Sequence, residues 1–306
     1  MLRYMSIRTA RALLTLWVIL TVVFVATRIS GDTIDFLLPE GTDPDSRAAM
    51  VQYLGLDRSI IEQYAIYVRE FLGGHFGLSF YERRPVEVIY LERLGPSLAL
   101  YASALILAIV LGMPLGIVAA LKRNTALARG IMTAAFLGYA IPNFVLAILL
   151  LLIFSFHLGW LPSAGAATPA HYVMPTLAVG SVLLAAVVRF TRSSMLDVLS
   201  QDYLRTARAK GVSERVLVLR HALRNALIPI LTVIGLQVTN VLGAAVIIET
   251  VFAWPGLGEQ IVLATIRRDY PTLQFGVLGF AAVVVTVNLA VDLLYSVVDP
   301  RVRVGG

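Results

Sequence analysis

Residues 97–121 read SLALYASALILAIVLGMPLGIVAAL and contain no charged side chain. A transmembrane helix needs about 20 consecutive apolar residues to cross the hydrocarbon core of a bilayer, so this run is long enough to span a membrane. Comparable apolar runs occur at five other places, residues 9–29, 131–156, 172–190, 228–248 and 277–298. We therefore expect an all-α membrane protein with six transmembrane helices.

The composition also indicates a membrane protein. Of the 306 residues, 58% are hydrophobic and only 14% are charged, whereas soluble proteins carry about 25% charged residues. The formal net charge is +6, but the basic residues lie in particular loops, without the interleaved aromatic residues of a nucleic-acid-binding surface. Cysteine is absent, which excludes disulfides, thiolate metal sites and cysteine nucleophiles. We therefore expect membrane lipid as a partner and no nucleic acid.

The distribution of lysine and arginine predicts the orientation of the spans, because short cytoplasmic loops are enriched in these residues. Three arginines lie in or before the start of the first span, which lacks a convincing small-residue cleavage site and is expected to stay attached. Residues 122–129 have three basic residues and no acid, and residues 189–224 have eight basic residues. Residues 157–171 contain no Lys, Arg, Asp or Glu. Both termini are therefore expected in the cytoplasm.

A long insertion at residues 30–96 separates the first two spans and holds six basic and eleven acidic residues. Long loops cross the membrane largely regardless of charge, so we expect this insertion to be a small external subdomain. The chain then divides into residues 1–96, the first span with the subdomain, and residues 97–306, the core of five helices. A cap over a transport pathway, a contact for an external partner and a structural lid are all open interpretations of the subdomain.

Three helices are expected within the subdomain. Pro44 should begin a helix that ends at Gly55, and Ser59 should cap a second helix that ends at Gly73-Gly74. A third short helix should cover residues 85–94.

The most basic polar segment, residues 202–229, reads DYLRTARAKGVSERVLVLRHALRNALIP. Good helix formers precede Gly211, which should end a first short helix. Ser213 should cap a second helix, and Pro229 is tolerated in the opening of the following span. The apolar side of the second helix is expected to consist of Val216, Leu217, Leu219, Ala222 and Leu223. The segment fits a docking element for a cytoplasmic partner, and it also fits an ordinary basic loop.

Another segment expected outside, residues 249–270, contains a turn at Trp254-Pro255-Gly256 followed by a short helix. Two interpretations are open. The segment is either a hairpin that dips toward a transport pathway or an interfacial helix anchored by Trp254 and Tyr270, since aromatic residues are enriched at membrane interfaces.

Polar residues inside the spans are few, so the sequence offers almost no side chains for a buried proton relay. Asn288 and Asp292 are spaced i, i+4 on the last span, and Gln237 and Asn240 lie on the fifth. These four side chains are candidates for lining a polar pathway. Hydrogen bonding between neighbouring helices is the alternative explanation.

Motifs of catalysis are missing from the sequence. It contains no G-x-x-x-x-G-K-[ST] phosphate loop, no H-E-x-x-H motif and no G-x-S-x-G motif, and its four histidines are scattered among different loops. We therefore expect neither a catalytic residue nor a metal site, which argues against a membrane enzyme. A secondary transporter or channel would need intramembrane charge pairs or inverted repeats, and neither is visible.

Several short motifs are similar to those of the dipeptide/oligopeptide permease subunits of binding-protein-dependent ABC importers. They are, in chain order, LGLDRSIIEQY (54–64), GHFGLS (74–79), TARAKG (206–211), RHALRNALIP (220–229), ETVFAWPGLG (249–258), RDYP (268–271) and DLLYSVVDPRVR (292–303). The chain resembles the permease that has a large external loop after its first span. The general importer signature begins Glu-Ala-Ala, where this chain has Arg205-Thr206-Ala207, and the glycine of that signature is kept as Gly211.

The resemblance implies a type I ABC importer transmembrane fold in a bacterial cytoplasmic membrane, with this chain forming half of a translocation pathway. The implied partners are a second permease, two cytoplasmic ATPases that bind ATP and Mg, and an external solute-binding protein. The chain itself would then hold no cofactor. Peptides are the implied cargo, and nickel or another small solute is the alternative.

The resemblance also implies roles for particular residues. The cytoplasmic coupling loop would be residues 201–226, and its ATPase-coupling residues would be Arg205, Thr206, Ala207, Arg208, Ala209, Lys210, Gly211 and Val212. The residues expected to contact the binding protein or to close the outer gate are Trp254, Pro255, Gly256, Arg267 and Arg268.

Overall fold

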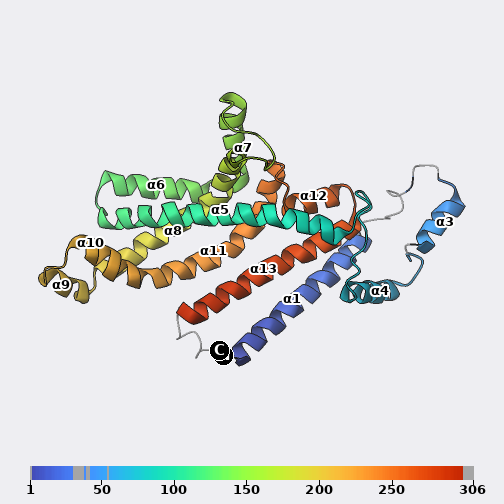
Figure 1. The fold of residues 1–306 in the computed structure, drawn as a ribbon, viewed down its shortest axis with the longest axis horizontal. Coiled ribbons are helices and arrows are strands. Elements are labelled where there is room, and N and C mark those ends of the chain that lie inside the picture. The colour runs from blue at the N-terminus through green and yellow to red at the C-terminus, as the bar shows by residue number, and fades with distance from the viewer. Residues whose placement is uncertain (1, 30–37, 39–41, 54, 299–306) are drawn as a thin grey trace. The chain divides into compact units, whose positions relative to one another are not determined.

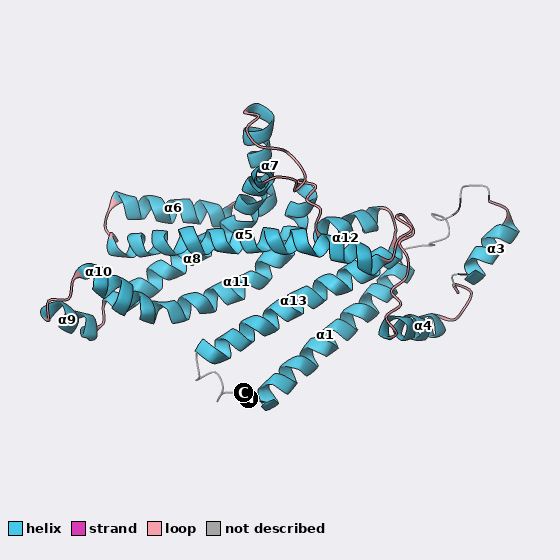
Figure 2. Ribbon diagram, in the orientation of Figure 1, coloured by secondary structure: helices cyan, strands magenta, loops and turns pink. Residues whose placement is uncertain are grey.

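The computed structural model describes residues 2–29, 38, 42–53 and 55–298. These residues form helices joined by loops (Figure 2). The one β-bridge among them pairs Leu78 with Pro85. The chain divides into two compact units. The core unit is Pro96–Pro255 with the chain ends Met1–Tyr4 and Thr286–Gly306, and the N-terminal unit is Met5–Gly95 with Gly256–Val285.

The units meet in the sequence between Gly95 and Pro96 and between Pro255 and Gly256. The expected division into residues 1–96 and 97–306 stays a prediction.

The core unit is built around α8, whose small and apolar side chains are buried. Ala178, Val179 and Ala186 of α8 are fully buried, and α6, α7 and α11 pack against this helix. Figure 1 shows α5, α6, α8 and α11 running alongside one another, with α7 turned away from them. The helices of this unit are α5 (Val86–Leu121, which begins in the N-terminal unit), α6 (Ala126–Ala140), α7 (Asn143–Leu150), the π-helix η1 (Leu151–His157), α8 (Pro169–Leu199), α9 (Asp202–Ala209), α10 (Glu214–Val216), the π-helix η2 (Leu217–Ala222) and α11 (Leu223–Val251).

Two glycines let α5 approach α8 closely. A Cβ added at Gly112 would lie 2.9 Å from Cγ1 of Val187, and one added at Gly116 would lie 2.6 Å from Cβ of Thr191. Small residues four apart allow such backbone approach between membrane helices. The expected second and fourth spans therefore pack against each other at these positions.

The expected span at residues 131–156 is not one straight helix. It is a pair of helices, Ala126–Ala140 and Asn143–His157, bent by 103°. Pro142 lies at the bend, where its missing N–H and its ring prevent continuation of the helix. By length and composition, the described residues contain four helices able to cross a membrane, or up to six if each bent pair is one span.

The N-terminal unit contains α1 (Leu2–Ile29), α3 (Pro44–Tyr53), α4 (Ile60–Leu72), α12 (Leu257–Ile266) and the first part of α13 (Tyr270–Val298). The predicted cap at Ser59 is confirmed. The Ser59 hydroxyl accepts the N–H of Glu62, and the Glu62 carboxylate accepts the N–H of Ser59, which completes a capping box. Phe24 of α1 packs its ring against Tyr64 and Tyr67 of α4, with ring centroids 5.3 and 5.4 Å apart.

The prediction of a separate helix at residues 85–94 is wrong, because α5 runs without a break from Val86 to Leu121 through Pro96. A proline inside a helix lacks the N–H for one helical hydrogen bond and its ring crowds the preceding turn, yet α5 continues through Pro96. Side chains of α5 before and after Pro96 are bonded to different units. Arg93 pairs with Glu259 at 2.8 Å in the N-terminal unit, and the Ser97 hydroxyl donates to Glu249 at 2.6 Å in the core unit.

Candidate functional site

The short helix α9 is anchored to the core unit by its apolar and aromatic side chains. Leu204 is fully buried, and Asn225 of α11 donates from Nδ2 to the Tyr203 hydroxyl at 2.7 Å. Asp202 lies in the first turn and Arg208 in the last, which complements the helix dipole at both ends. The helix is therefore held by one face while its other residues remain available.

The glycine turn after α9 is confirmed. Gly211 has φ +79°, its N–H donates to Arg208 O at 2.9 Å, and the N–H of Val212 donates to Ala207 O at 3.2 Å. These two bonds form a Schellman motif, which requires a left-handed residue after the helix. An added Cβ at Gly211 would meet nothing within 4 Å, so the backbone conformation and not crowding within the chain selects glycine here.

An ion pair closes the turn. Arg208 donates from Nε to Glu214 Oε1 at 2.6 Å and from Nη2 to Glu214 Oε2 at 3.3 Å. The hydrogen bond to Glu214 raises the pKa of Arg208. Both side chains are exposed, so the pair adds little to stability. Its effect is to fix the direction of the chain between α9 and α10.

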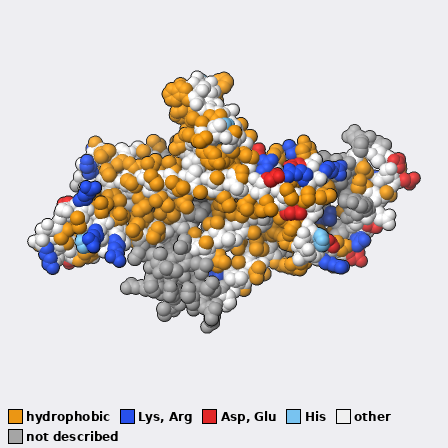
Figure 3. Space-filling view, viewed as in Figure 1, with side chains coloured by type: hydrophobic (Ala, Val, Ile, Leu, Met, Phe, Trp, Pro, Cys, Tyr) orange, Lys and Arg blue, Asp and Glu red, His pale blue; other side chains and the backbone are white. Residues whose placement is uncertain are grey.

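The exposed residues of α9 and of the turn after it are mostly basic or small. Arg205, Thr206, Ala209, Lys210 and Gly211 are exposed, whereas Ala207 and Val212 are half-buried. Figure 3 shows Lys and Arg side chains gathered at the end of the core unit that carries α9 and α10. We call residues 205–212, which comprise the end of α9 and the turn after it, the α9 loop.

Two details of the following helix differ from expectation. Ser213 occupies the N-cap position of α10 but makes no side-chain capping bond. The buried residues are Leu217, Val218 and Ala222, while Val216 and Leu219 are exposed. The π-helical hydrogen bonding of η2 widens each turn relative to an α-helix, which moves the buried face from Leu219 to Val218.

The proposed pathway residues are only partly described. Gln237 and Asn288 are half-buried and both have interaction partners, which agrees with either a polar pathway or hydrogen bonding between helices. The side chains of Asn240 and Asp292 lie outside the described residues.

Trp254 lies inside the core unit, which does not fit an anchor at the membrane interface; its role in contacting the binding protein or closing the outer gate stays a prediction. Trp254 is fully buried, donates from Nε1 to Pro96 O at 3.1 Å and meets the ring of Tyr172 edge-on at 4.5 Å. A tryptophan contributes more stability in the core when its N–H finds a carbonyl there. Gly256 is also buried and Pro255 is half-buried.

In the N-terminal unit, Arg267 is exposed and its guanidinium lies 3.8 Å from the ring centroid of Tyr81. Arg268 is half-buried and has φ +50°, which is uncommon for a residue other than glycine. Tyr270 is buried and therefore does not serve as an interfacial anchor.

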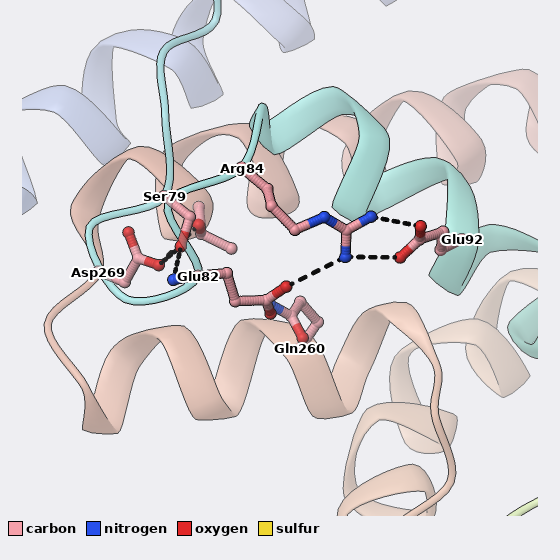
Figure 4. A network of polar contacts seen from close by, with 7 residues as sticks. Ser79, Glu82, Arg84, Glu92, Gln260 and Asp269 are labelled. Carbon is pink, nitrogen blue, oxygen red and sulfur yellow. Dashed lines mark hydrogen bonds and ion pairs between the residues drawn. The ribbon is translucent and has the colours of Figure 1, made fainter.

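Sequence reasoning missed a buried carboxylate in the N-terminal unit. Asp269 accepts a hydrogen bond from the Ser79 hydroxyl at 2.5 Å (Figure 4). It accepts two more, from the Phe80 N–H at 2.9 Å and the Thr272 hydroxyl at 2.8 Å. Beside it, Arg84 bonds Glu92 and Glu82. Ser79 and Asp269 both lie in the motifs that carry the family resemblance, but nothing in the sequence indicated that these motifs meet.

A family model described as "Binding-protein-dependent transport system inner membrane component" matches residues 112–304. The chain is 41% identical over 304 residues to the glutathione transport system permease protein GsiC of Escherichia coli (strain K12), and 42% identical over 304 residues to GsiC of Salmonella typhi. In both comparisons 99% of each chain is covered.

Among solved structures, an inward-facing conformation of the MetNI methionine ABC transporter matches with a TM-score of 0.60 and 18% identity. The match covers 70% of this chain and 98% of that chain. At this identity the likeness concerns the fold alone.

Proposed function

Because the chain belongs to the binding-protein-dependent transport system inner membrane components, we propose that it couples ATP hydrolysis by partner ATPases to solute import through the α9 loop. The chain is a multi-pass permease subunit of an ABC importer with the type I transmembrane fold. The family and the fold class expected from the sequence are thereby confirmed.

The observation that carries the coupling proposal is the one-sided anchoring of α9. Its exposed residues offer a basic, small-residue surface to a partner, while Leu204 and the Tyr203–Asn225 hydrogen bond connect the helix to the core unit. A partner that moves α9 therefore acts on α11 directly through Asn225. A ligand or partner shifts a conformational equilibrium only through contacts that differ between states, and in the proposed mechanism this surface is where the ATPase makes them.

The proposed assembly contains a second permease, two cytoplasmic ATPases that bind ATP and Mg, and an external solute-binding protein. In the proposed assembly, this chain holds no cofactor of its own. Both termini and the α9 loop face the cytoplasm of a bacterial cell, and the insertion after α1 lies outside the cytoplasmic membrane. The positive charge of the short loops supports this orientation.

Peptides are the proposed cargo. Glutathione is a specific candidate among them, because the similar GsiC permeases belong to a glutathione transport system. Nickel or another small solute is the alternative. Calorimetric titration of the partner binding protein with glutathione, neutral dipeptides and nickel chelates distinguishes these cargoes.

Copurification tests the coupling proposal. The permease pair is expected to retain both ATPases, and the loaded binding protein is expected to stimulate ATP hydrolysis in proteoliposomes. The proposal is contradicted if the permease purifies without ATPases. It is also contradicted if the binding protein does not change the rate of ATP hydrolysis.

A further inference from the structure

Arg189 lies at the end of the apolar run of α8, a helix long and apolar enough to cross a membrane. Residues 173–188, directly before it, contain no Asp, Glu, Lys or Arg. The end of α8 at Leu199 is about 15 Å further on, at 1.5 Å per residue. Ionisable side chains in a membrane span are costly and mark functional sites, unless they reach out to the interface. The direction of the Arg189 side chain therefore decides its environment.

The Arg189 side chain points back into the apolar run and not toward the α9 end of α8. Its guanidinium lies 5.2 Å from the ring centroid of Tyr139 on α6. Gly138, the neighbour of Tyr139, faces Ser181, because a Cβ added at Gly138 would lie 3.5 Å from Ser181 O. Ser181 precedes Arg189 by about two helical turns, so Tyr139 lies toward the start of α8, the direction in which helical side chains lean. The charge therefore lies among apolar residues and is turned away from the nearer headgroups.

Arg189 has no carboxylate partner in the part of the chain that the structure describes. It takes part in none of the ion pairs there, and its guanidinium contacts two aromatic rings, Tyr139 and, at 5.4 Å, Phe190. A ring binds the face of a guanidinium and leaves its in-plane N–H groups free for an anion. Arg189 is exposed and Tyr139 is 52% exposed, so a molecule beside the core unit reaches both side chains.

The face of α8 that carries Arg189 is polar and open from this residue to the α9 end. Ser193 and Asp197 follow at i+4 and i+8 on the same side of the helix, and all three residues are exposed. The opposite side of α8 is closed by α5, where Gly116 meets Thr191. Polar and charged residues of membrane helices face the bundle interior or water and not lipid. This face therefore fits the wall of an aqueous path.

An anionic partner for Arg189 must come from outside this chain. We propose that Arg189 lines the translocation pathway and binds a carboxylate of the cargo as the cargo passes α8. Its in-plane N–H groups match the two oxygens of a carboxylate, while Tyr139 holds the guanidinium by one face. The inference rests on the proposed function, in which this chain forms half of the pathway. It adds that the permease itself, and not only the binding protein, favours cargo with a negative charge.

Ser193→Cys reports on water and charge beside Arg189, because the chain has no cysteine of its own. The permease pair in lipid nanodiscs is treated with an anionic reagent, sulfonatoethyl methanethiosulfonate, or with its cationic trimethylammonium counterpart, and modification of this chain is read by mass spectrometry. We expect both reagents to react. The ratio of anionic to cationic rates is expected to fall about threefold or more in Arg189→Gln, the size of a unit-charge effect over several Å in water.

Three further variants control for charge and folding. Arg69→Gln removes an exposed arginine of α4 and is expected to leave the reagent ratio unchanged. Arg189→Lys keeps the charge and is expected to keep most of the ratio. Arg189→Met loses the charge but keeps an unbranched stem against Tyr139, so it takes the place of Arg189→Gln if that variant does not insert.

Transport separates a cargo contact from a position that is merely aqueous. Proteoliposomes with the binding protein import Ala-Ala or Ala-Ala amide, which differ in the terminal carboxylate. The binding protein is the same for every permease variant, so its own preference cancels when the ratio of the two import rates is compared between variants. We expect this ratio to fall about tenfold or more in Arg189→Gln, the usual effect of losing a hydrogen bond to a charged group, and to recover in part in Arg189→Lys.

The proposal is overturned if Ser193→Cys reacts with neither reagent, because Arg189 then faces lipid or is buried against the second permease. It is also overturned if either ratio is the same with and without the charge of Arg189. If the permease retains its ATPases and imports cargo while both ratios stay unchanged, the Arg189 assignment alone is wrong. If both ratios depend on Arg189 and no ATPase copurifies, the coupling proposal alone is wrong.

Discussion

The hydroxyl of Ser79 donates to the carboxylate of Asp269 at 2.5 Å, although the two residues are 190 positions apart. Asp269 is 3% exposed and accepts two further hydrogen bonds, from the Phe80 N–H and the Thr272 hydroxyl. One carboxylate thereby joins the loop before α5 to the corner between α12 and α13. This corner also begins α13, the helix that carries Tyr270, Pro271 and Gln274.

Replacing Asp269 with alanine is expected to destabilise the protein by about 3 kcal/mol, because it leaves two or three buried donors without an acceptor, each costing about 1–3 kcal/mol before relaxation. Thermal unfolding of the detergent-solubilised chain, followed by tryptophan fluorescence, measures the change. Asp57→Ala removes an exposed carboxylate of the same unit and serves as the control. Equal melting of the two variants contradicts the structural role of Asp269.

Local features were predictable from the sequence because their causes are local. A serine with glutamate three residues later forms the capping box at Ser59, and a glycine after a polar helical run forms the left-handed turn at Gly211. The six apolar runs likewise predicted the membrane class. In each case the determining residues lie within a few positions of one another.

Other features depend on partners that the sequence does not reveal. The sequence suggested a short helix at residues 85–94 separate from the span at 97–121, but α5 continues through both, bonded to its neighbours at Arg93 and Ser97. Trp254 suggested a surface anchor, but the carbonyl of Pro96 satisfies its N–H inside the core unit. The Ser79–Asp269 bond is of the same kind, since two recognisable motifs do not indicate that they meet.

The topology is tested by single cysteines, which are unambiguous in a chain that has none. Asp45→Cys in α3 and Asn124→Cys before α6 both replace exposed residues. In intact cells, an impermeant thiol reagent is expected to label the first and not the second, because only the insertion after α1 faces outward. Labelling after membrane permeabilisation controls for reactivity. The reverse pattern in intact cells contradicts the proposed orientation.

The anchoring of α9 is tested at Leu204. Leu204→Ala removes a fully buried side chain, a change that typically costs about 2–5 kcal/mol, and here the loss falls on a helix of eight residues. We expect the ATPases to remain bound through the exposed residues, while hydrolysis is less coupled to transport. Solute imported per ATP hydrolysed in proteoliposomes is the measurement.

Leu219→Ala is the matched control for Leu204→Ala, because Leu219 is 51% exposed in the neighbouring helix. It is expected to keep the wild-type ratio of transport to hydrolysis. If both variants lower the ratio equally, the effect comes from lost apolar surface in general and not from the anchor of α9.

The docking surface itself is tested at Gly211 and Ala209. Gly211→Leu places a branched side chain at φ +79°, which strains the turn by about 1–2 kcal/mol and adds bulk at the surface. Ala209→Trp adds bulk without that backbone strain, since Ala209 is exposed and helical. Overpacking a fitted contact costs about 1–3 kcal/mol, so both variants are expected to weaken ATPase retention by about fivefold to a hundredfold.

Two milder variants separate bulk from strain and charge. Gly211→Asn is expected to retain the ATPases, because asparagine adopts the left-handed conformation at low cost and its side chain is small. Arg205→Ala should weaken retention only slightly, since its 3.5 Å contact with Asp202 is exposed and such pairs contribute about 0–1 kcal/mol. If Gly211→Leu releases the ATPases and Ala209→Trp does not, the partner depends on the geometry of the turn. If neither variant releases them, the α9 loop is an ordinary basic loop and the ATPases bind elsewhere.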